Sequence, residues 1–429
     1  MDDEFLPLTD ADDAAEAAET EQENIASDET DERPESTEPS EPPKKPEKPK
    51  KAEKAEKQPT RGSRVLRRVL AGILTLLLVV LALLVFVFRD ELTGAGLRRI
   101  FGVGESAAAR EAFTYETGAM QVFAPAGDGL AVASGSSVQL LNAAGETVFK
   151  QVISYDAPAV FASEKGALFC DLGGTGCILA DFEGNERNPS SGAEIQTAGM
   201  NEDGWFYLVT TESGYKGLVS VYNSACEKQY EWWSGSGYVL RAAISPDNRS
   251  LAVLCAEREG ARLHFFAMNS DTERGSATVA DTLLIDLCWL GSDSVCAVGE
   301  TGVWFYAGDG TEKGVYALDG RYLLDYEFGR TGFAAIFVSA YRSGAGGTLL
   351  TLDARGQTLG SAELNRDVIS LSAVGKQILA MTGDCLALYS QDMVRQSANE
   401  TLMTARRAIL RPAGDILLLH AYSAERFSF

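Results

Sequence analysis

The sequence predicts an all-β domain over residues 113–429, a β-propeller of eight four-stranded blades, preceded by one transmembrane helix and a disordered N-terminal tail. Three observations predict this arrangement. An apolar run of twenty residues without a charge ends at residue 88. Beyond residue 110, short apolar runs alternate with clusters of Gly, Asp, Asn and Ser, which is typical of strands and turns. The turns between those runs recur with a nearly constant period.

Residues 1–62 are predicted to form a disordered cytoplasmic tail. Its first part, residues 1–43, carries seventeen Asp or Glu and one basic residue, and its second part, residues 44–62, is rich in Lys and Pro. Neither part has enough large apolar side chains to offset the conformational entropy that folding would remove. The acidic run is interpreted as a solvating tail, with a docking segment for a basic partner as the alternative.

Residues 69–88, VLAGILTLLLVVLALLVFVF, are predicted to cross a membrane as an uncleaved signal-anchor. Twenty residues span about 30 Å as a helix, which matches the hydrocarbon thickness of a bilayer. Residues 63–68 form a basic flank that favours a cytoplasmic N-terminus and an extracellular C-terminal domain. Residues 89–112 follow as a Gly- and Ala-containing stalk.

The propeller prediction rests on two interleaved series of turns. A hairpin made of an apolar strand, a turn and a second apolar strand recurs at intervals of 38 to 45 residues, with turns centred near 127, 165, 203, 247, 292, 331, 374 and 413. A second series of seven turns keeps the same period and falls between the members of the first, beginning near 142, 181, 222, 268, 307, 352 and 389. Two hairpins in about 40 residues make one four-stranded blade.

The eighth repeat lacks a complete fourth strand because the chain ends at Phe429. Phe113–Glu116 lies before the first repeat and belongs to none of them. We therefore expect Phe113–Glu116 to supply the missing outer strand and to close the ring, which would leave no open sheet edge at the seam. Seven blades with an additional hairpin remain as the alternative.

A resemblance to known proteins supports location and fold. Ser245–Leu254, SPDNRSLAVL, resembles the hairpin of bacterial WD40-like and TolB-like propellers, with Asn248 in place of the usual Gly. The layout around Leu97–Ser106 and Phe113–Met120 is similar to that of an uncharacterised family of clostridial-type Gram-positive bacteria. Members of that family combine a charged tail, one membrane helix, a stalk and an extracytoplasmic propeller-like domain. The resemblance covers most of residues 64–429 and implies no chemistry, because the family has no established activity.

The sequence holds no motif for catalysis, a metal or a cofactor. Its two histidines, His264 and His420, lie inside apolar strands and are interpreted as half-buried structural residues. A His-based metal site or a Ser–His–Asp triad would need one of these two residues, and neither has the necessary neighbours in the sequence. We therefore expect no catalytic residue, no metal and no cofactor.

The seven cysteines contain two pairs that flank predicted hairpin turns. Cys170 and Cys177 flank one turn, and Cys288 and Cys296 flank another, so each pair should face across two strands. An exported domain could oxidise either pair to a disulfide. The alternative is that all four are small apolar core residues that remain thiols.

The residues Trp232, Trp233 and Tyr238 form an aromatic cluster at the end of the third repeat. Because neighbouring side chains in a strand point to opposite faces, the two tryptophans cannot pack on the same side of a blade. We expect one to pack between blades and the other to be exposed. The exposed part could provide a contact surface for a sugar or a protein.

Two hypotheses about function are consistent with these sequence features. The first is a non-enzymatic scaffold or sensor that presents the propeller to a protein or glycan of the cell envelope. The second is a hydrolase or lyase that acts on an envelope polymer at the mouth of the propeller channel. Inward Asp, Glu or Arg side chains would favour the enzyme. Outside the tail, forty-one acidic and twenty-six basic residues follow residue 68, a net charge of −15 that argues against nucleic acid as a partner.

Overall fold

The computed structural model describes residues 112–329, 331–343, 346–401 and 403–429. The predicted tail 1–62, basic flank 63–68 and transmembrane helix 69–88 lie outside the described residues, as does the predicted stalk apart from Ala112. Within the described ranges, no helix has the length and the apolar character needed to cross a membrane.

The described chain folds into eight four-stranded antiparallel sheets, which we number as blades 1 to 8 in chain order. Blade 1 consists of β2 (Val122–Ala126), β3 (Gly129–Ala133), β4 (Ser137–Leu141) and β5 (Thr147–Val152). Blade 2 consists of β6 (Pro158–Ser163), β7 (Gly166–Asp171), β8 (Cys177–Asp181) and β9 (Glu186–Arg187). Blade 3 consists of β10 (Ile195–Met200), β11 (Phe206–Thr210), β12 (Gly217–Tyr222) and β13 (Lys228–Ser234). Blade 4 consists of β14 (Tyr238–Ile244), β15 (Ser250–Glu257), β16 (Gly260–Ala267) and β17 (Glu273–Ala280).

The second half of the ring repeats the same arrangement. Blade 5 consists of β18 (Leu284–Trp289), β19 (Ser294–Gly299), β20 (Gly302–Ala307) and β21 (Glu312–Ala317). Blade 6 consists of β22 (Tyr322–Gly329), β23 (Phe333–Ser339), β24 (Gly347–Asp353) and β25 (Thr358–Leu364). Blade 7 consists of β26 (Val368–Val374), β27 (Gln377–Thr382), β28 (Leu386–Ser390) and β29 (Arg395–Asn399). Blade 8 consists of β30 (Arg407–Leu410), β31 (Ile416–Leu419), β32 (Ser423–Phe427) and β1 (Ala112–Thr114).

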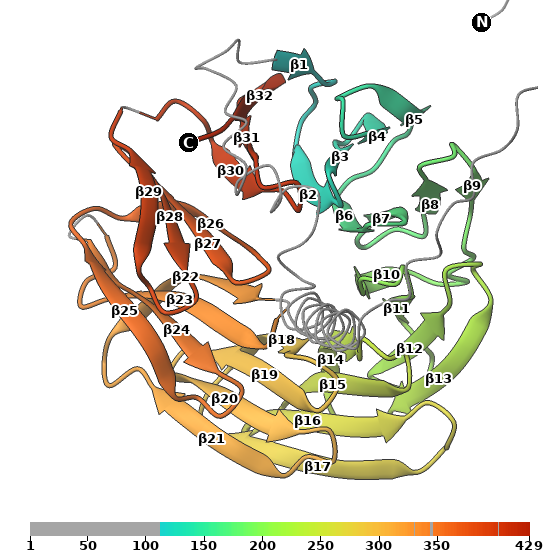
Figure 1. Ribbon diagram of the computed structural model, residues 1–429. Helices are drawn as coiled ribbons and strands as arrows, with labels where there is room; N and C mark the ends of the chain where they lie inside the picture. The colour runs from blue at the N-terminus through green and yellow to red at the C-terminus, as the bar shows by residue number, and fades with distance from the viewer. Residues whose placement is uncertain (1–111, 330, 344–345, 402) are drawn as a thin grey trace, which may run out of the picture. The chain divides into compact units, whose positions relative to one another are not determined.

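The blades stand around a common centre, with the first strand of each blade innermost (Figure 1). Neighbouring blades bury apolar side chains against each other, so that the second strands β3 and β23 are buried along their whole length. Outer strands such as β5 alternate buried and exposed residues, because their edge faces the solvent. The eight blades confirm the predicted fold, and the seven-blade alternative is wrong.

The ring closes through its N-terminal strand, as the sequence predicted. Strand β1 pairs antiparallel with β32, with Phe113 opposite Ala424, and becomes the outer strand of blade 8. The side chain of Tyr115 continues this contact, because its hydroxyl donates to the carbonyl oxygens of His420 at 2.6 Å and Ser423 at 2.9 Å. Both ends of the described chain therefore belong to one sheet.

A buried arginine joins the turns of blades 8 and 1. Arg411 is 4% exposed and opens the first turn of blade 8. Its Nη1 donates to the carbonyl oxygens of Asp128 at 2.7 Å and Ala143 at 3.0 Å, which belong to the two turns of blade 1. Its Nε donates to Asp415 Oδ1 at 2.8 Å, and its Nη2 pairs with the other oxygen of the same carboxylate. No sequence pattern predicts this contact.

Local chemistry explains both predicted turn series. In the first-series turns of blades 3 and 8 the fourth turn residue adopts a positive φ, +75° at Gly204 and +88° at Gly414. Asn248 stands at the same place with φ +57°, which Asn tolerates better than other non-glycine residues. In the second series, the side-chain oxygen of the first turn residue accepts backbone N–H groups two and four residues later, at Asn142, Asp181, Asn223 and Asp353.

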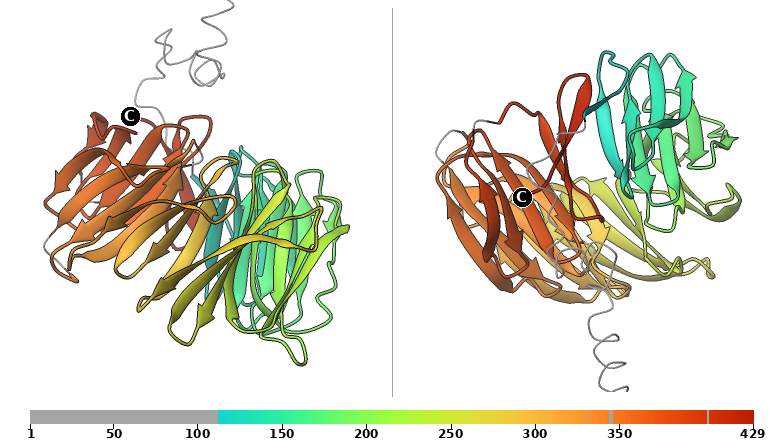
Figure 2. Two further views of the ribbon diagram at one scale, coloured as in Figure 1. Left: turned by 90° about the horizontal axis from the view of Figure 1, so that it is seen from below. Right: turned by 45° about the horizontal axis from the view of Figure 1, so that its top comes forward.

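The antiparallel topology gives the ring two different faces (Figure 2). Both turn series lie on one face, which we call the turn face. The connections between blades and the loops between second and third strands lie on the opposite face, where the inner strands begin, and we call it the entry face. The two faces carry different side chains, as described below.

Candidate functional site on the channel wall and the entry face

The inner strands present one equivalent residue each, four positions before the start of the first turn. The turns define this position. The backbone N–H of the first turn residue donates a hydrogen bond to a carbonyl oxygen at or just before the start of the second strand, as at Asn201, Ser245, Leu290 and Arg411. In blades 3 to 7 the pairing register shifts just before this residue, which places a β-bulge there. From blade 1 to blade 8 the residues at this wall position are Val122, Ala159, Thr197, Arg241, Asp286, Asp325, Ser370 and Arg407.

Wall residues of blades 3 to 5, together with Tyr326 of blade 6, form a continuous polar chain. Arg241 Nη1 donates to Thr197 Oγ1 at 2.8 Å, and Arg241 Nε lies 3.7 Å from Asp286 Oδ1. The hydroxyl of Tyr326, the neighbour of Asp325, donates to Asp286 Oδ2 at 3.0 Å. Arg241 and Asp286 therefore link four successive blades through their side chains. Charged residues of the kind predicted as a sign of an enzyme are present on the inner strands, and two of them, Arg241 and Asp286, form an ion pair with each other.

The wall continues across the seam of the ring. Arg407 Nη1 donates to the carbonyl oxygen of Phe123 at 3.0 Å, which joins blade 8 to blade 1. Ser370 Oγ donates to the carbonyl oxygen of Ala408 at 3.1 Å and lies 3.2 Å from the N–H of the same residue. Blades 1 and 2 contribute only the apolar Val122 and Ala159, so the wall is polar on one arc of the ring and apolar on the other.

Burial raises the pKa of both wall carboxyls. For Asp286 the loss of hydration outweighs the opposing effects of Arg241, of the N–H of Leu287 and of the Tyr326 hydroxyl. For Asp325 burial again dominates, against hydrogen bonds from backbone N–H groups and the charge of Arg407. Carboxyls whose pKa is raised in this way can donate or accept a proton closer to neutral pH than exposed ones.

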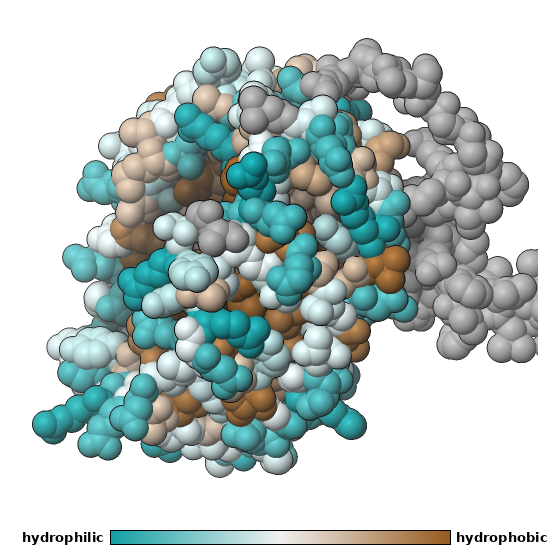
Figure 3. All heavy atoms as spheres, turned by 90° about the vertical axis from the view of Figure 1, so that its left-hand side faces the viewer, coloured by the Kyte–Doolittle hydropathy of each residue, from teal (hydrophilic) through white to brown (hydrophobic). Residues whose placement is uncertain are grey.

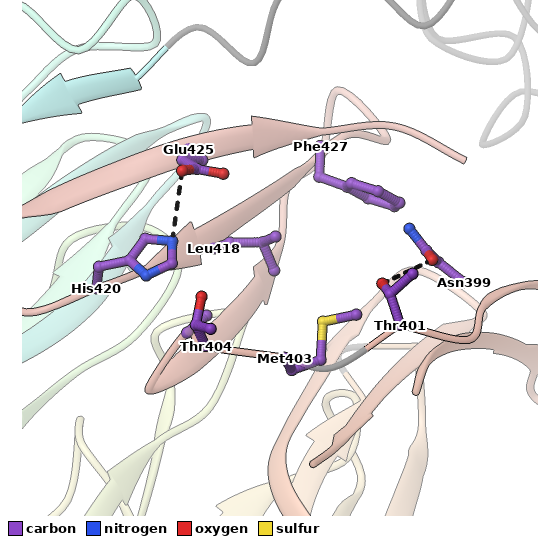
Figure 4. A pocket seen from close by; sticks show the side chains of 9 residues that line it. Asn399, Thr401, Met403, Thr404, Leu418, His420, Glu425 and Phe427 are labelled. Carbon is purple, nitrogen blue, oxygen red and sulfur yellow. Dashed lines mark hydrogen bonds and ion pairs between the residues drawn. The ribbon is translucent and has the colours of Figure 1, made fainter. Parts of the chain in front are cut away.

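A small pocket lies between blades 7 and 8 (Figure 4). Its volume of about 50 Å³ is far below the roughly 300–1,000 Å³ typical of sites for small organic ligands. His420 Nε2 and Glu425 Oε1 lie 3.8 Å apart on its wall. The other histidine, His264, is buried, with Nδ1 2.9 Å from Glu273 Oε1. Both histidines therefore lie within strands or at their ends, as structural members of the blades.

The predicted aromatic cluster is divided between two surroundings. Trp232 packs against blade 4, with its ring 5.0 Å from that of His264 and 5.2 Å from that of Phe266. Trp233 is 43% exposed, and Tyr238, at the start of the next inner strand, is 58% exposed. Lys216 Nζ lies 4.9 Å from the centre of the Tyr238 ring. The structure thus places one tryptophan between blades and brings the other to the surface, as strand alternation predicts.

Exposed apolar side chains are concentrated on the entry face. Of the fifteen large apolar residues that are exposed in the described chain, two lie on outer strands away from the entry-face end (Val315 and Leu359) and two on the turn face (Val394 and Phe429). The remaining eleven belong to the entry face, namely Met120, Val152, Tyr215, Trp233, Tyr238, Leu283, Ile285, Tyr322, Tyr341, Ile369 and Tyr422. The flank of the ring that carries β25 and β29 instead shows hydrophilic and hydrophobic residues interspersed (Figure 3).

The two predicted cysteine pairs are both cross-strand neighbours. Cys170 lies opposite Cys177, with the sulfur atoms 3.2 Å apart, and Cys288 lies opposite Cys296. All seven cysteines are thiols in the structure.

These features define a closed eight-bladed β-propeller with four-stranded blades. The chain belongs to a family of unknown function, DUF5711, whose model matches residues 108–410. Among solved structures it is similar to BamB from Moraxella catarrhalis, with 12% identity over 75% of this chain and 99% of that chain and a TM-score of 0.50. It is also similar to the C-terminal WD40 domain of Sif2, with 10% identity over 75% of this chain and 97% of that domain and a TM-score of 0.52. At such identities the likeness shows the fold alone. No curated protein matches the sequence.

The wall position is not evident from the sequence of any single repeat. Its only signal is a polar residue inside an otherwise apolar inner strand, such as Arg241 between Val239 and Ala242. That signal becomes visible once the eight inner strands are aligned on their turns.

Proposed function

We propose that this protein is a non-enzymatic interaction scaffold or sensor, anchored in the cell membrane by the predicted helix 69–88, whose propeller binds an envelope protein or glycan outside the cell. The observation that carries the proposal is the concentration of exposed apolar and aromatic residues on the entry face. Aromatic side chains contribute large contact areas to binding surfaces, and apolar residues that gather on one face of a domain indicate a partner.

The test is a binding experiment with the full chain in detergent. Wild-type protein is incubated with solubilised envelope proteins and, separately, with purified cell-wall glycan. A double variant, Trp233→Ala with Tyr238→Ala, should lose most of the bound component. The matched control Val394→Ala removes an equally exposed apolar residue from the turn face and should retain it. Equal binding by the double variant and the wild type would contradict the proposal.

The second candidate function is a hydrolase or lyase for an envelope polymer, with its site on the channel wall. It is favoured by the raised pKa values of Asp286 and Asp325, since one such carboxyl could act as a general acid. It ranks second because Arg241 and Tyr326 already engage Asp286. Release of reducing ends from cell-wall glycan by the wild type, but not by Asp286→Asn or Asp325→Asn, would establish it in place of the scaffold.

A further inference from the structure

The two cysteine pairs differ in their position on the backbone ladder. In blade 2 the N–H of Asp171 donates to the carbonyl oxygen of Gly176 at 2.9 Å, so Cys170 and Cys177 form the next, non-hydrogen-bonded pair. At such pairs the Cα atoms of antiparallel strands approach to about 4.5 Å, within the range that disulfides span. In blade 5 the N–H of Leu290 donates to the carbonyl oxygen of Ser294, which places Cys288 and Cys296 two steps away, at a hydrogen-bonded pair. There the Cα atoms are about 5.5 Å apart, which also lies within the range that disulfides span, so the positions of the sulfur atoms decide between the two pairs.

The sulfur atoms of the two pairs are placed differently. Those of Cys170 and Cys177 lie 3.2 Å apart, so a bond of about 2.05 Å needs a movement of little more than 1 Å. The thiol of Cys288 is directed to the carbonyl oxygen of Trp289, at 3.5 Å. The structure thus favours disulfide formation between Cys170 and Cys177, whereas the sequence did not distinguish the two pairs.

We propose that Cys170 and Cys177 are a modification site, at which an oxidant of the disulfide or azo class converts the two thiols to a disulfide. One thiolate attacks the oxidant and forms a covalent adduct. The second thiol then attacks the first sulfur, the S–S bond forms, and the oxidant leaves with two electrons and two protons. This inference is independent of the function proposed above.

The bond would close a loop on the entry face. Residues 171–176 connect β7 to β8, and their backbone contacts the next blade, since Gly173 N donates to the carbonyl oxygen of Ile195 at 2.8 Å and Ile195 N to that of Gly174 at 2.7 Å. A disulfide at the base of this loop would therefore stiffen the junction between blades 2 and 3. Cys170 is fully buried and Cys177 is 5% exposed, so Cys177 is the thiol of the pair that an oxidant would meet first.

The experiment treats the reduced full chain in detergent with diamide, a small azo oxidant that becomes a hydrazine. Thiols are then counted in denaturant, and the linked peptides are identified by mass spectrometry. We expect the seven thiols to fall by two, with the Cys170–Cys177 link as the product. The variant Cys177→Ser should lose none of its thiols, and the matched control Cys288→Ser should still lose two.

Three outcomes would overturn the inference. The first is a wild-type chain that keeps all seven thiols after diamide treatment. The second is a link between different residues, of which Cys226 is the nearest competitor, because it packs in the same apolar cluster as Cys170 and Cys177. Loss of two thiols by Cys177→Ser would likewise contradict the assignment.

Discussion

Replacement of Arg411 by Met should weaken the closure of the ring. The side chain is 4% exposed and gives hydrogen bonds to Asp415, Asp128 and Ala143. The substitution therefore leaves the Asp415 carboxylate and the Asp128 carbonyl oxygen without this donor, while the Ala143 carbonyl oxygen keeps its hydrogen bond from Arg426. Removing one partner of a buried ion pair costs about 3–5 kcal/mol. The Asp415 side chain is 22% exposed, and water can solvate it in part, so we expect the lower end, about 3 kcal/mol. A domain of about 320 residues has an unfolding entropy near 0.7 kcal/mol/K, which corresponds to a Tm lower by about 4 °C.

The assay is thermal unfolding followed by circular dichroism, with urea unfolding as a second measure. The control is Arg395→Met, which removes an arginine of the same kind from an ion pair with Glu400 whose side chains are 51% and 71% exposed. This control should leave Tm unchanged. A second variant, Arg411→Met with Asp415→Leu, should recover part of the loss, because it removes the unpaired carboxylate. If Arg411→Met were as stable as Arg395→Met, the reasoning about ring closure would be refuted.

Three further predictions follow from other contacts. Burial raises the pKa of Asp286, so the folded protein holds this proton more tightly than the unfolded chain does. The free energy of unfolding should therefore fall as pH rises through the raised pKa. Urea unfolding measured from pH 4 to 8 should show a smaller fall for Asp286→Asn than for the wild type. Trp232→Ala should cost about 2–3 kcal/mol in the same assay, whereas the exposed Trp233→Ala should change little. Oxidation of Cys170 and Cys177 closes a short loop and should add about 2.5 kcal/mol, or about 4 °C in Tm by calorimetry, with no gain in Cys177→Ser.

The sequence predicted the number of blades because turn chemistry is local. The turn at Asn248 and the side-chain-capped turns at Asn142 and Asp181 are visible in short segments of sequence, and their spacing counts the blades. The closing strand followed from a missing element in the eighth repeat, and the structure has it at Ala112–Thr114. Trp232 and Trp233 were separated correctly because strand alternation depends only on neighbours in the chain.

The side-chain contacts between blades could not be predicted from the sequence, because they depend on the pairing register of the strands in each blade. Arg241 contacts Thr197 and Asp286, about 45 residues away on either side, and a β-bulge beside it sets the direction of its side chain. Arg411 reaches Asp128, at the other end of the domain. For the cysteines, the sequence showed that each pair flanks a turn, and only the hydrogen-bond ladder shows which pair brings its sulfur atoms together.

The residues of the channel wall and those of the entry face differ in how freely they can contact a ligand. Wall charges such as Arg241 and Asp286 bond to neighbouring blades, and a ligand could engage them only by replacing contacts that hold the ring together. Entry-face residues such as Trp233 and Tyr238 have much of their surface in solvent and can bind without such a loss. A partner therefore gains more from the entry face than from the wall. This difference, together with the apolar arc of the wall at Val122 and Ala159, favours the scaffold over the enzyme.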